Sequence, residues 1–359
     1  MRGLEVAERQ APSDRVDFGR GTVRWRRAGL RFRMDLRTVV VCGLIAAATL
    51  AVALASLATG DFRLDPLEVI QAVFAGDGFA HTVVVEWRMP RVVAAIVFGA
   101  ALGLSGAVFQ SITRNPLASP DIIGFTAGSF TGALVVILAI GASYAQVAGG
   151  ALVGGLATAA VVYVLAYARG VQGFRLIVVG IGISAMLTSA NTYLVMVSDH
   201  DAAVTATVWG VGSLNATTWE QAALGTAVVF ALVACLVTLS RPLKKLELGD
   251  DAAKALGVRV EPARLGLVVV GVALVATVTA AAGPIAFVAL AAPQIGMRLA
   301  RTPGVALLPA AFMGAFILCA SDYVAQHLLP TAMPVGIVTV VVGGTYLVWL
   351  LVSEARRRL

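Results

Sequence analysis

The sequence predicts an all-α polytopic membrane protein of about ten transmembrane helices. Three observations predict it: the composition, the long apolar runs and the distribution of positive charge. The 359 residues are 59% hydrophobic and 13% charged, whereas soluble domains are about 45–50% apolar and about 25% charged. Such a composition excludes a disordered chain, a secreted domain held by disulfides and a nucleic-acid-binding module. The chain is therefore expected in a lipid bilayer.

Ten apolar runs have the length that a helix needs to cross a bilayer core, roughly 20 residues. They cover residues 38–58, 92–110, 121–140, 145–168, 175–197, 220–240, 263–282, 284–300, 305–328 and 334–353. The eighth run is short and rich in proline. Residues 1–37 are polar and arginine-rich without apolar periodicity, which predicts a disordered basic cytoplasmic tail before one transmembrane domain, 38–359.

The positive charges predict how the helices are oriented. With the N-terminus inside, 24 of the 27 Lys and Arg residues fall on the cytoplasmic side, and Arg63, Arg88 and Arg91 fall outside. Cytoplasmic loops carry this excess in membrane proteins. An even number of spans, with both termini in the cytoplasm, is therefore predicted.

The residues that usually carry catalysis or bind metals are sparse. Cys42, Cys235 and Cys319 lie in apolar stretches and are interpreted as small buried hydrophobic residues, and the three histidines are scattered. None of the three lysines lies in a phosphate-binding loop, and no catalytic constellation is present. We therefore expect no catalytic residue, no metal site and no cofactor, and the chain is not predicted to be an enzyme.

Asp322 is the clear charged residue within the predicted spans. Carboxylates inside a membrane often belong to proton or ion relays. A proton-coupled transporter usually needs a second such group with a cationic partner, and the sequence shows no basic residue at the same depth. A structural hydrogen-bonding role is therefore favoured for Asp322, and an ion-coupled secondary transporter remains the alternative.

Small and polar residues recur at helical spacing within two sets of spans. Gly99/Gly103 and Gly150/Gly154 are four residues apart, which lets helices approach closely; packing within the chain is favoured over a subunit interface. Ser184, Thr188, Asn191 and Ser198 share one face of the fifth span. This stripe either lines a water-filled path or bonds to its own backbone.

Two loops at opposite ends of the predicted spans carry distinctive motifs. The outer sequence Arg88-Met-Pro-Arg91 is a stiff cationic pair, suited either to gripping carboxylates or to anchoring the span at the membrane surface. On the inner side, the turn at 114–121 includes Arg114, Asn115 and Pro116, and Asp121 is placed to cap the third span.

The long inner loop 241–262 is predicted to contain a short amphipathic helix. Apolar residues recur at helical spacing across 246–258, and Gly257 is a natural stop. Within 246–258 the acids precede the single lysine, Lys254, as the helix dipole favours. The residues concerned are Leu248, Gly249, Asp250, Asp251, Lys254, Leu256 and Gly257. The apolar face of this helix needs a partner, either membrane or protein.

Six motifs in order resemble the FecCD/BtuC-type permeases, the membrane subunits of ABC importers for iron-siderophores, haem and cobalamin. They are RMPR (88–91), the stretch 99–125, WGVGSLNATTW (209–219), LELGDDAAKALGV (246–258), AGPIAFVALAAP (282–293) and MPVGIVTVVVGG (333–344). The resemblance runs from about residue 40 to the C-terminus. Residues 174–187, 246–258 and 342–351 are most similar to the G-type membrane subunit of ferric-enterobactin importers.

The resemblance implies partners and site residues. Arg88 and Arg91 would dock a periplasmic or lipid-anchored substrate-binding protein. The 246–258 loop, supported by Arg114, Asn115 and Pro116, would contact one of two ATPase subunits. The fifth span, with Ser184, Thr188 and Asn191, would line the translocation path. The expected location is the bacterial plasma (inner) membrane, and the expected mechanism is alternating access driven by ATP.

The chain departs from the family pattern at three places. Gln294 stands where many relatives have histidine, and Ala332-Met333 stands where many have Glu-Leu. Some relatives also carry a third outer arginine near the position of Gln326. Fewer outer docking groups favour a heterodimer with a second permease over a homodimer. A ferric siderophore of catecholate or related type is the expected cargo, with cobalamin or haem as the nearer alternative. No nucleic-acid partner is expected.

Overall fold

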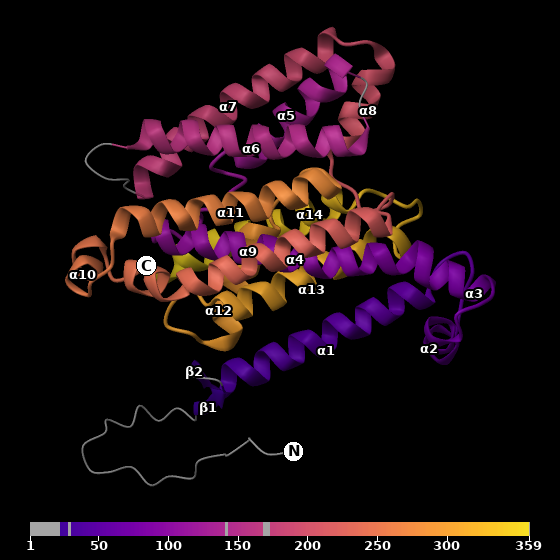
Figure 1. Ribbon diagram of the computed structural model, residues 1–359, viewed down its shortest axis with the longest axis horizontal. Coiled ribbons are helices and arrows are strands. Elements are labelled where there is room, and N and C mark those ends of the chain that lie inside the picture. Colours follow the sequence, from indigo (N-terminus) through magenta and orange to yellow (C-terminus); the bar gives the residue numbers. More distant parts are fainter. Residues whose placement is uncertain (1–21, 28–29, 141–142, 168–172, 359) are drawn as a thin grey trace.

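The computed structural model describes residues 22–27, 30–140, 143–167 and 173–358, and they form an elongated helical bundle (Figure 1). In chain order the elements are β1 (Thr22–Arg27), β2 (Leu30–Asp35), α1 (Leu36–Ala58), α2 (Pro66–Ala75), α3 (Phe79–His81), the π-helix η1 (Thr82–Arg88), α4 (Met89–Thr113), α5 (Phe125–Ile140), α6 (Tyr144–Ala166), α7 (Gly173–Val197), α8 (His200–Gly210), α9 (Trp219–Leu246), α10 (Asp250–Ala255), α11 (Val260–Ala282), α12 (Val288–Ala300), α13 (Leu307–His327) and α14 (Val335–Arg358).

Each of the ten predicted spans corresponds to one helix of the structure. Within the described residues, eight helices are long and apolar enough to cross a membrane. The other two predicted spans are the 16-residue α5 and the 13-residue α12. The span predicted at 284–300 starts too early, because the backbone turns at Phe287, whose φ is 69°. The all-α polytopic fold is confirmed.

The end of the N-terminal tail differs from the prediction. Strands β1 and β2 pair antiparallel, with Thr22 opposite Asp35 and Arg27 opposite Leu30. The expected disorder of residues 1–37 is therefore wrong for 22–27 and 30–35, while 1–21 lie outside the described residues. Arginines alternate with apolar residues along both segments, and this period of two is the strand signal that the sequence interpretation missed.

The outer loop after α1 also folds into helices that the sequence analysis did not predict. Pro66 begins α2, the Asp65 and Glu68 side chains form a capping box, and Gly76 ends the helix in the left-handed region at φ 72°. These are standard helix start and stop residues. The helix was missed because its ten residues are too few for the transmembrane pattern.

Close helix packing holds the centre of the bundle together. Helix α4 is buried along most of its length and packs on α13. A side chain at Gly99, Gly103 or Gly314 would collide with the backbone of the facing helix. The same holds between α5 and α6 for Gly150 and Gly154. Packing within the chain, the favoured reading of the glycine spacing, is confirmed.

A second group of helices lies on one side of this centre. Figure 1 shows α5, α6, α7 and α8 as a layer beside α11, while α1 runs along the opposite side. Helix α7 is sparsely covered, since only Leu176, Gly180 and Asn191 are buried among its residues. Cys235 on α9 is exposed, so its interpretation as a buried residue is wrong; its face of α9 points out of the bundle. Cys42 and Cys319 are buried as predicted.

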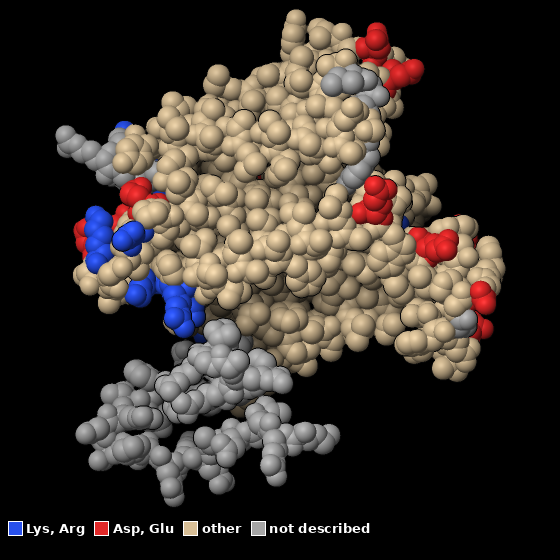
Figure 2. Space-filling view, in the orientation of Figure 1, with Lys and Arg blue, Asp and Glu red and all other residues tan. Residues whose placement is uncertain are grey.

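Charges gather at the two ends of the bundle. Figure 2 shows Lys and Arg clustered at the end that carries α10, and mainly Asp and Glu at the opposite end. Helices α2 and α3 lie at that opposite end, which we call the outer end, and the α10 end is called the inner end (Figure 1). The long sides between them are almost free of charge on the face shown, as a membrane-embedded surface requires.

Candidate functional site

The outer end contains a buried ion pair between α4 and α13. Arg91 donates from Nε to Oδ2 of Asp322 at 2.8 Å and from Nη2 to Oδ1 at 2.7 Å. The two side chains are 18% and 5% exposed. The expectation that Asp322 has no basic partner at its depth is therefore wrong. It failed because α4 begins at Met89, which places Arg91 inside the helix rather than in the loop before it.

Arg88 is also held within the chain. Its guanidinium donates to the carbonyl oxygens of Leu57 at 2.6 Å and Phe62 at 2.7 Å. Leu57 lies in the last turn of α1, where carbonyl groups lack helical partners. Neither arginine of the predicted outer pair is thus a free cation: Arg88 ties the end of η1 to the end of α1, and Arg91 ties α4 to α13.

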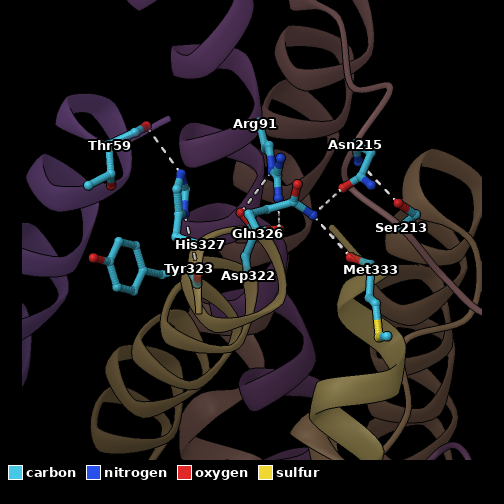
Figure 3. Close-up of polar contacts among 9 residues, drawn as sticks. All are labelled: Thr59, Arg91, Ser213, Asn215, Asp322, Tyr323, Gln326, His327 and Met333. Carbon is cyan, nitrogen blue, oxygen red and sulfur yellow. Dashed lines mark hydrogen bonds and ion pairs between the residues drawn. The ribbon is translucent and has the colours of Figure 1, made fainter. Parts of the chain in front are cut away.

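The last turn of α13 extends this outer network (Figure 3). Gln326 donates from Nε2 to Oδ1 of Asn215 at 2.7 Å and to the carbonyl of Met333 at 3.0 Å. The ring nitrogens of His327 lie 3.1 Å from the carbonyl oxygen of Thr59 and 3.2 Å from that of Tyr323. One helix turn therefore joins the end of α1, the loop before α9 and the loop before α14.

A cavity of about 480 Å³ opens between α5, α7 and α8. Its polar lining consists of Thr126, Thr188, Asn191, Thr192 and Thr207. Two of the three predicted path residues, Thr188 and Asn191, are therefore brought together there. Ser184 is not part of the lining and lies instead against Gly124.

The polar residues of this cavity are uncharged, and the rest of the lining is apolar or glycine. Thr188 donates its hydroxyl to the carbonyl of Ser184, at 2.8 Å, so the backbone-bonding alternative also holds for this residue. Asn191 is 4% exposed, and its Oδ1 has no hydrogen-bond partner among the described residues. The cavity thus offers hydroxyl groups and an amide to a solute, with no fixed charge to trap it.

Asp121 joins the segment before α5 to the residue that precedes α12. Its Oδ1 accepts from the Thr126 hydroxyl at 2.6 Å, and its Oδ2 accepts from the backbone N–H of Phe287 at 3.2 Å. The predicted link to the third span exists through Thr126, near the start of α5. The link to Phe287, which precedes α12, was missed because the two residues are 166 positions apart.

The inner end presents the predicted short helix. Helix α10 covers Asp250–Ala255, and Gly249 and Gly257 flank it with φ of 106° and 78°. Leu248 and Leu256 are 67% and 51% exposed. The helix and its glycine stop are confirmed; Ala253 packs into the core, whereas the flanking Leu248 and Leu256 are left largely exposed.

Ion pairs hold α10 onto the bundle. Asp250 accepts from Arg264 at 2.7 Å and lies 3.8 Å from Arg114. Asp251 and Lys254 form an exposed pair with each other at 3.6 Å. Predicted contact residues therefore divide into two sets: Asp250 and Arg114 take part in the contact between α10 and the bundle, and Asp251 and Lys254 pair with each other at the surface.

The turn that supports α10 has its own local structure. Arg114 ends α4 in the left-handed region, with φ 51°. The Asn115 side chain then accepts from the backbone N–H of Leu117 at 2.9 Å, across Pro116. This turn fixes where the Arg114 side chain meets Asp250.

Known proteins are similar to this chain over most of its length. The model of the FecCD transport family matches residues 48–353. The ferric enterobactin transport system permease protein of Escherichia coli strain K12 is 42% identical over 324 residues, 90% of this chain and 98% of that protein. The achromobactin transport system permease protein of Dickeya dadantii is 35% identical, covering 92% and 96%.

Two further similarities bear on fold and cargo. The hemin transport system permease protein of Yersinia pestis is 33% identical, covering 76% of this chain and 83% of that protein. Among solved structures, a metal-chelate type ABC transporter in an inward-facing conformation has a TM-score of 0.78 and 28% identity, covering 88% and 99%.

Proposed function

This chain belongs to the FecCD transport family, and we propose that it is the permease subunit that carries a ferric siderophore into the bacterial cytoplasm. It is an ABC-transporter permease and not an enzyme, and ATP hydrolysis belongs to a separate subunit. Its location is a membrane. The bacterial inner membrane, with both termini in the cytoplasm, is part of the proposal.

The identity to the ferric enterobactin permease carries the choice of cargo. That similarity, 42% over 98% of the relative, exceeds the 33% over 83% found for the hemin permease. A catecholate or related siderophore is therefore preferred to haem, and cobalamin remains the other alternative within the same machinery.

The cavity beside α7 supports a conduit role. Its hydroxyl and amide lining, with Thr188 and Asn191, can hydrate a solute without binding it tightly. Helix α7 is uncovered along part of its length, where Ile181, Met186 and Tyr193 are 50%, 69% and 65% exposed. We infer that a second permease of the same type, in a heterodimer, closes the path along this flank.

The inner end supports coupling to the ATPase. Leu248 and Leu256, on either side of α10, are exposed at the end of the bundle, outside its apolar sides. Ion pairs fix α10 to α4 and α11. A rigid apolar projection of this kind suits insertion into a cleft of one of two ATPase subunits. Alternating access would follow, with nucleotide-driven motion of α10 passed through Asp250 to the bundle.

The outer end would receive the substrate-binding protein. Because Arg88 and Arg91 are held by the chain itself, we propose that they shape the docking surface and offer it partly exposed guanidinium edges. The pair between Arg91 and Asp322 also weakens the ion-coupled alternative, since a carboxylate held bidentately by arginine is poorly suited to shuttling protons.

Deletion of this chain is expected to abolish uptake of one ferric siderophore while other iron sources are still used. Iron-55 uptake with a catecholate, a hydroxamate, ferric citrate and haem, together with labelled cobalamin, identifies the cargo. Uptake that stops on ATP depletion and survives collapse of the proton gradient supports the ABC mechanism. Lost cobalamin uptake with every siderophore still used would contradict the proposed cargo.

Replacing both Thr188 and Asn191, in the cavity lining, with the bulkier leucine is expected to slow uptake about tenfold. This corresponds to a rise of about 1.4 kcal/mol in the free-energy barrier to transport. The bulk narrows the path and removes the amide that faces it. The measurement is the initial rate of uptake in membranes with equal amounts of the chain. Thr345→Leu is the matched control, since Thr345 is exposed on α14 and also bonds its own backbone, at 2.8 Å. Equal rates in both variants would remove the cavity from the path.

A further inference from the structure

A groove at the inner end of the chain gathers positive charge. It has a volume of about 420 Å³ and lies between the end of α9, the turn after α10 and the start of α11. Arg241, Lys245 and Arg259 contribute its cations, and Leu239, Pro262 and Ala263 contribute apolar surface. No acidic residue belongs to its lining. A concave site with cations and no anion is built for a negatively charged ligand.

Two of the three cations are available to such a ligand. Lys245 donates to the carbonyl of Leu256 at 3.0 Å, so this lysine also holds the turn after α10. Among the described residues, Arg241 and Arg259 make no ion pair or side-chain hydrogen bond. The nearby acid Glu261 is paired with Arg264 at 3.6 Å. The positive charge of Arg241 and Arg259 is therefore uncompensated within the part of the chain that the structure describes.

The groove lies where the apolar flank of the bundle ends. On α9, Phe230 and Val237 are 66% and 53% exposed, and on α11, Leu265 and Val269 are 45% and 49% exposed. These exposed apolar residues lie on the same two helices whose ends line the groove. Arginine and lysine at the end of such a surface sit at the level of lipid headgroups.

We propose that this groove binds the phosphate headgroup of an anionic phospholipid, whose acyl chains lie along the exposed flank of α9 and α11. Basic pockets between transmembrane helices on the cytoplasmic side are suited to such headgroups. Placing the groove in the inner leaflet rests on the proposed orientation of the chain. The binding itself does not depend on transport, so each can fail without the other.

The full-length chain, purified in mild detergent, tests the proposal by native mass spectrometry during titration with phosphatidylglycerol or phosphatidylcholine. The wild-type chain is expected to retain phosphatidylglycerol preferentially. The Arg241→Gln/Arg259→Gln variant is expected to bind phosphatidylglycerol about tenfold to thirtyfold more weakly, because each arginine near an anionic headgroup adds electrostatic attraction to the binding free energy. Similar retention of both lipids, or equal affinity in variant and wild type, would overturn the proposal.

Matched variants separate charge from folding. Arg175→Gln/Arg301→Gln removes two arginines outside the groove and is expected to leave lipid binding unchanged. Arg241→Lys/Arg259→Lys keeps the charge and is expected to retain most of the lipid binding. If lipid binding falls in both the lysine and the glutamine variants while the helical circular dichroism spectrum is unchanged, a purely electrostatic site is contradicted.

Two further arms identify the occupant. Inorganic phosphate at millimolar concentration is expected not to displace the lipid, because it lacks the acyl chains; full displacement would assign the groove to a free anion. Co-purification of the ATPase is expected to be the same with the Gln variant as with the wild-type chain. Loss of the ATPase with unchanged lipid binding would make the groove a protein contact and overturn the proposal.

Discussion

Replacing Asp322 with alanine is expected to destabilise the folded chain by about 3–5 kcal/mol, the usual cost of removing one partner of a buried ion pair. The Asp322 side chain is 5% exposed, and the substitution leaves the Arg91 guanidinium, 18% exposed, without its carboxylate. Arg91→Ala is expected to cost a similar amount by leaving the carboxylate unpaired. Thermal unfolding of the purified chain in detergent measures both.

The double variant Arg91→Met/Asp322→Leu decides what the pair does. If the two residues mainly stabilise the contact between α4 and α13, the double variant unfolds close to the wild-type temperature, because apolar residues can replace a buried pair. With the single variants Arg91→Met and Asp322→Leu, the double-mutant cycle then gives a coupling energy of opposite sign to the losses caused by those single substitutions. Additive losses would show that each side chain has its own partners.

Transport by the same double variant separates the roles left open for these residues. Uptake near the wild-type rate is expected for a structural pair. Normal stability with weakened binding of the substrate-binding protein would assign Arg91 to docking. Normal stability and docking with lost uptake would revive the ion-coupled role of Asp322.

The spans could be predicted from the sequence because their signal is local. A run such as 38–58 must be helical in a bilayer to satisfy its backbone hydrogen bonds, and α1, Leu36–Ala58, matches it within two residues. The short helix α10 was also predictable, since Gly257 ends it and the acids precede Lys254. These features depend on neighbours within a few positions.

Contacts between distant segments could not be predicted in the same way. Arg91 and Asp322 are 231 positions apart, and a shift of helix start by a few residues decides whether they face each other. The pairing of β1 with β2 was missed for a different reason. Arginine at alternate positions hides the apolar period when a segment is judged by its overall polarity.

Replacing Leu248 and Leu256 with aspartate is expected to reduce ATP-driven uptake to background. Buried anchors at protein interfaces are worth about 2 kcal/mol or more each, so losing two weakens association with the ATPase about a thousandfold. Both side chains are more than half exposed, and the fold of the chain alone should be unaffected. Uptake and ATPase co-purification, at equal membrane abundance, measure the effect.

Two further variants show whether the apolar surface of Leu248 and Leu256 is itself responsible for the loss of ATP-driven uptake. Leu248→Met/Leu256→Met keeps the apolar volume and is expected to keep uptake, because leucine and methionine exchange at little cost. Asp250→Asn is expected to leave the surface intact but loosen its attachment to Arg264, so the ATPase still co-purifies while uptake per ATP hydrolysed falls. Full uptake by the aspartate variant would exclude this helix from coupling. If the ATPase no longer co-purifies with Asp250→Asn while the methionine variant is normal, Asp250 contacts the ATPase directly instead of only holding α10 on the bundle.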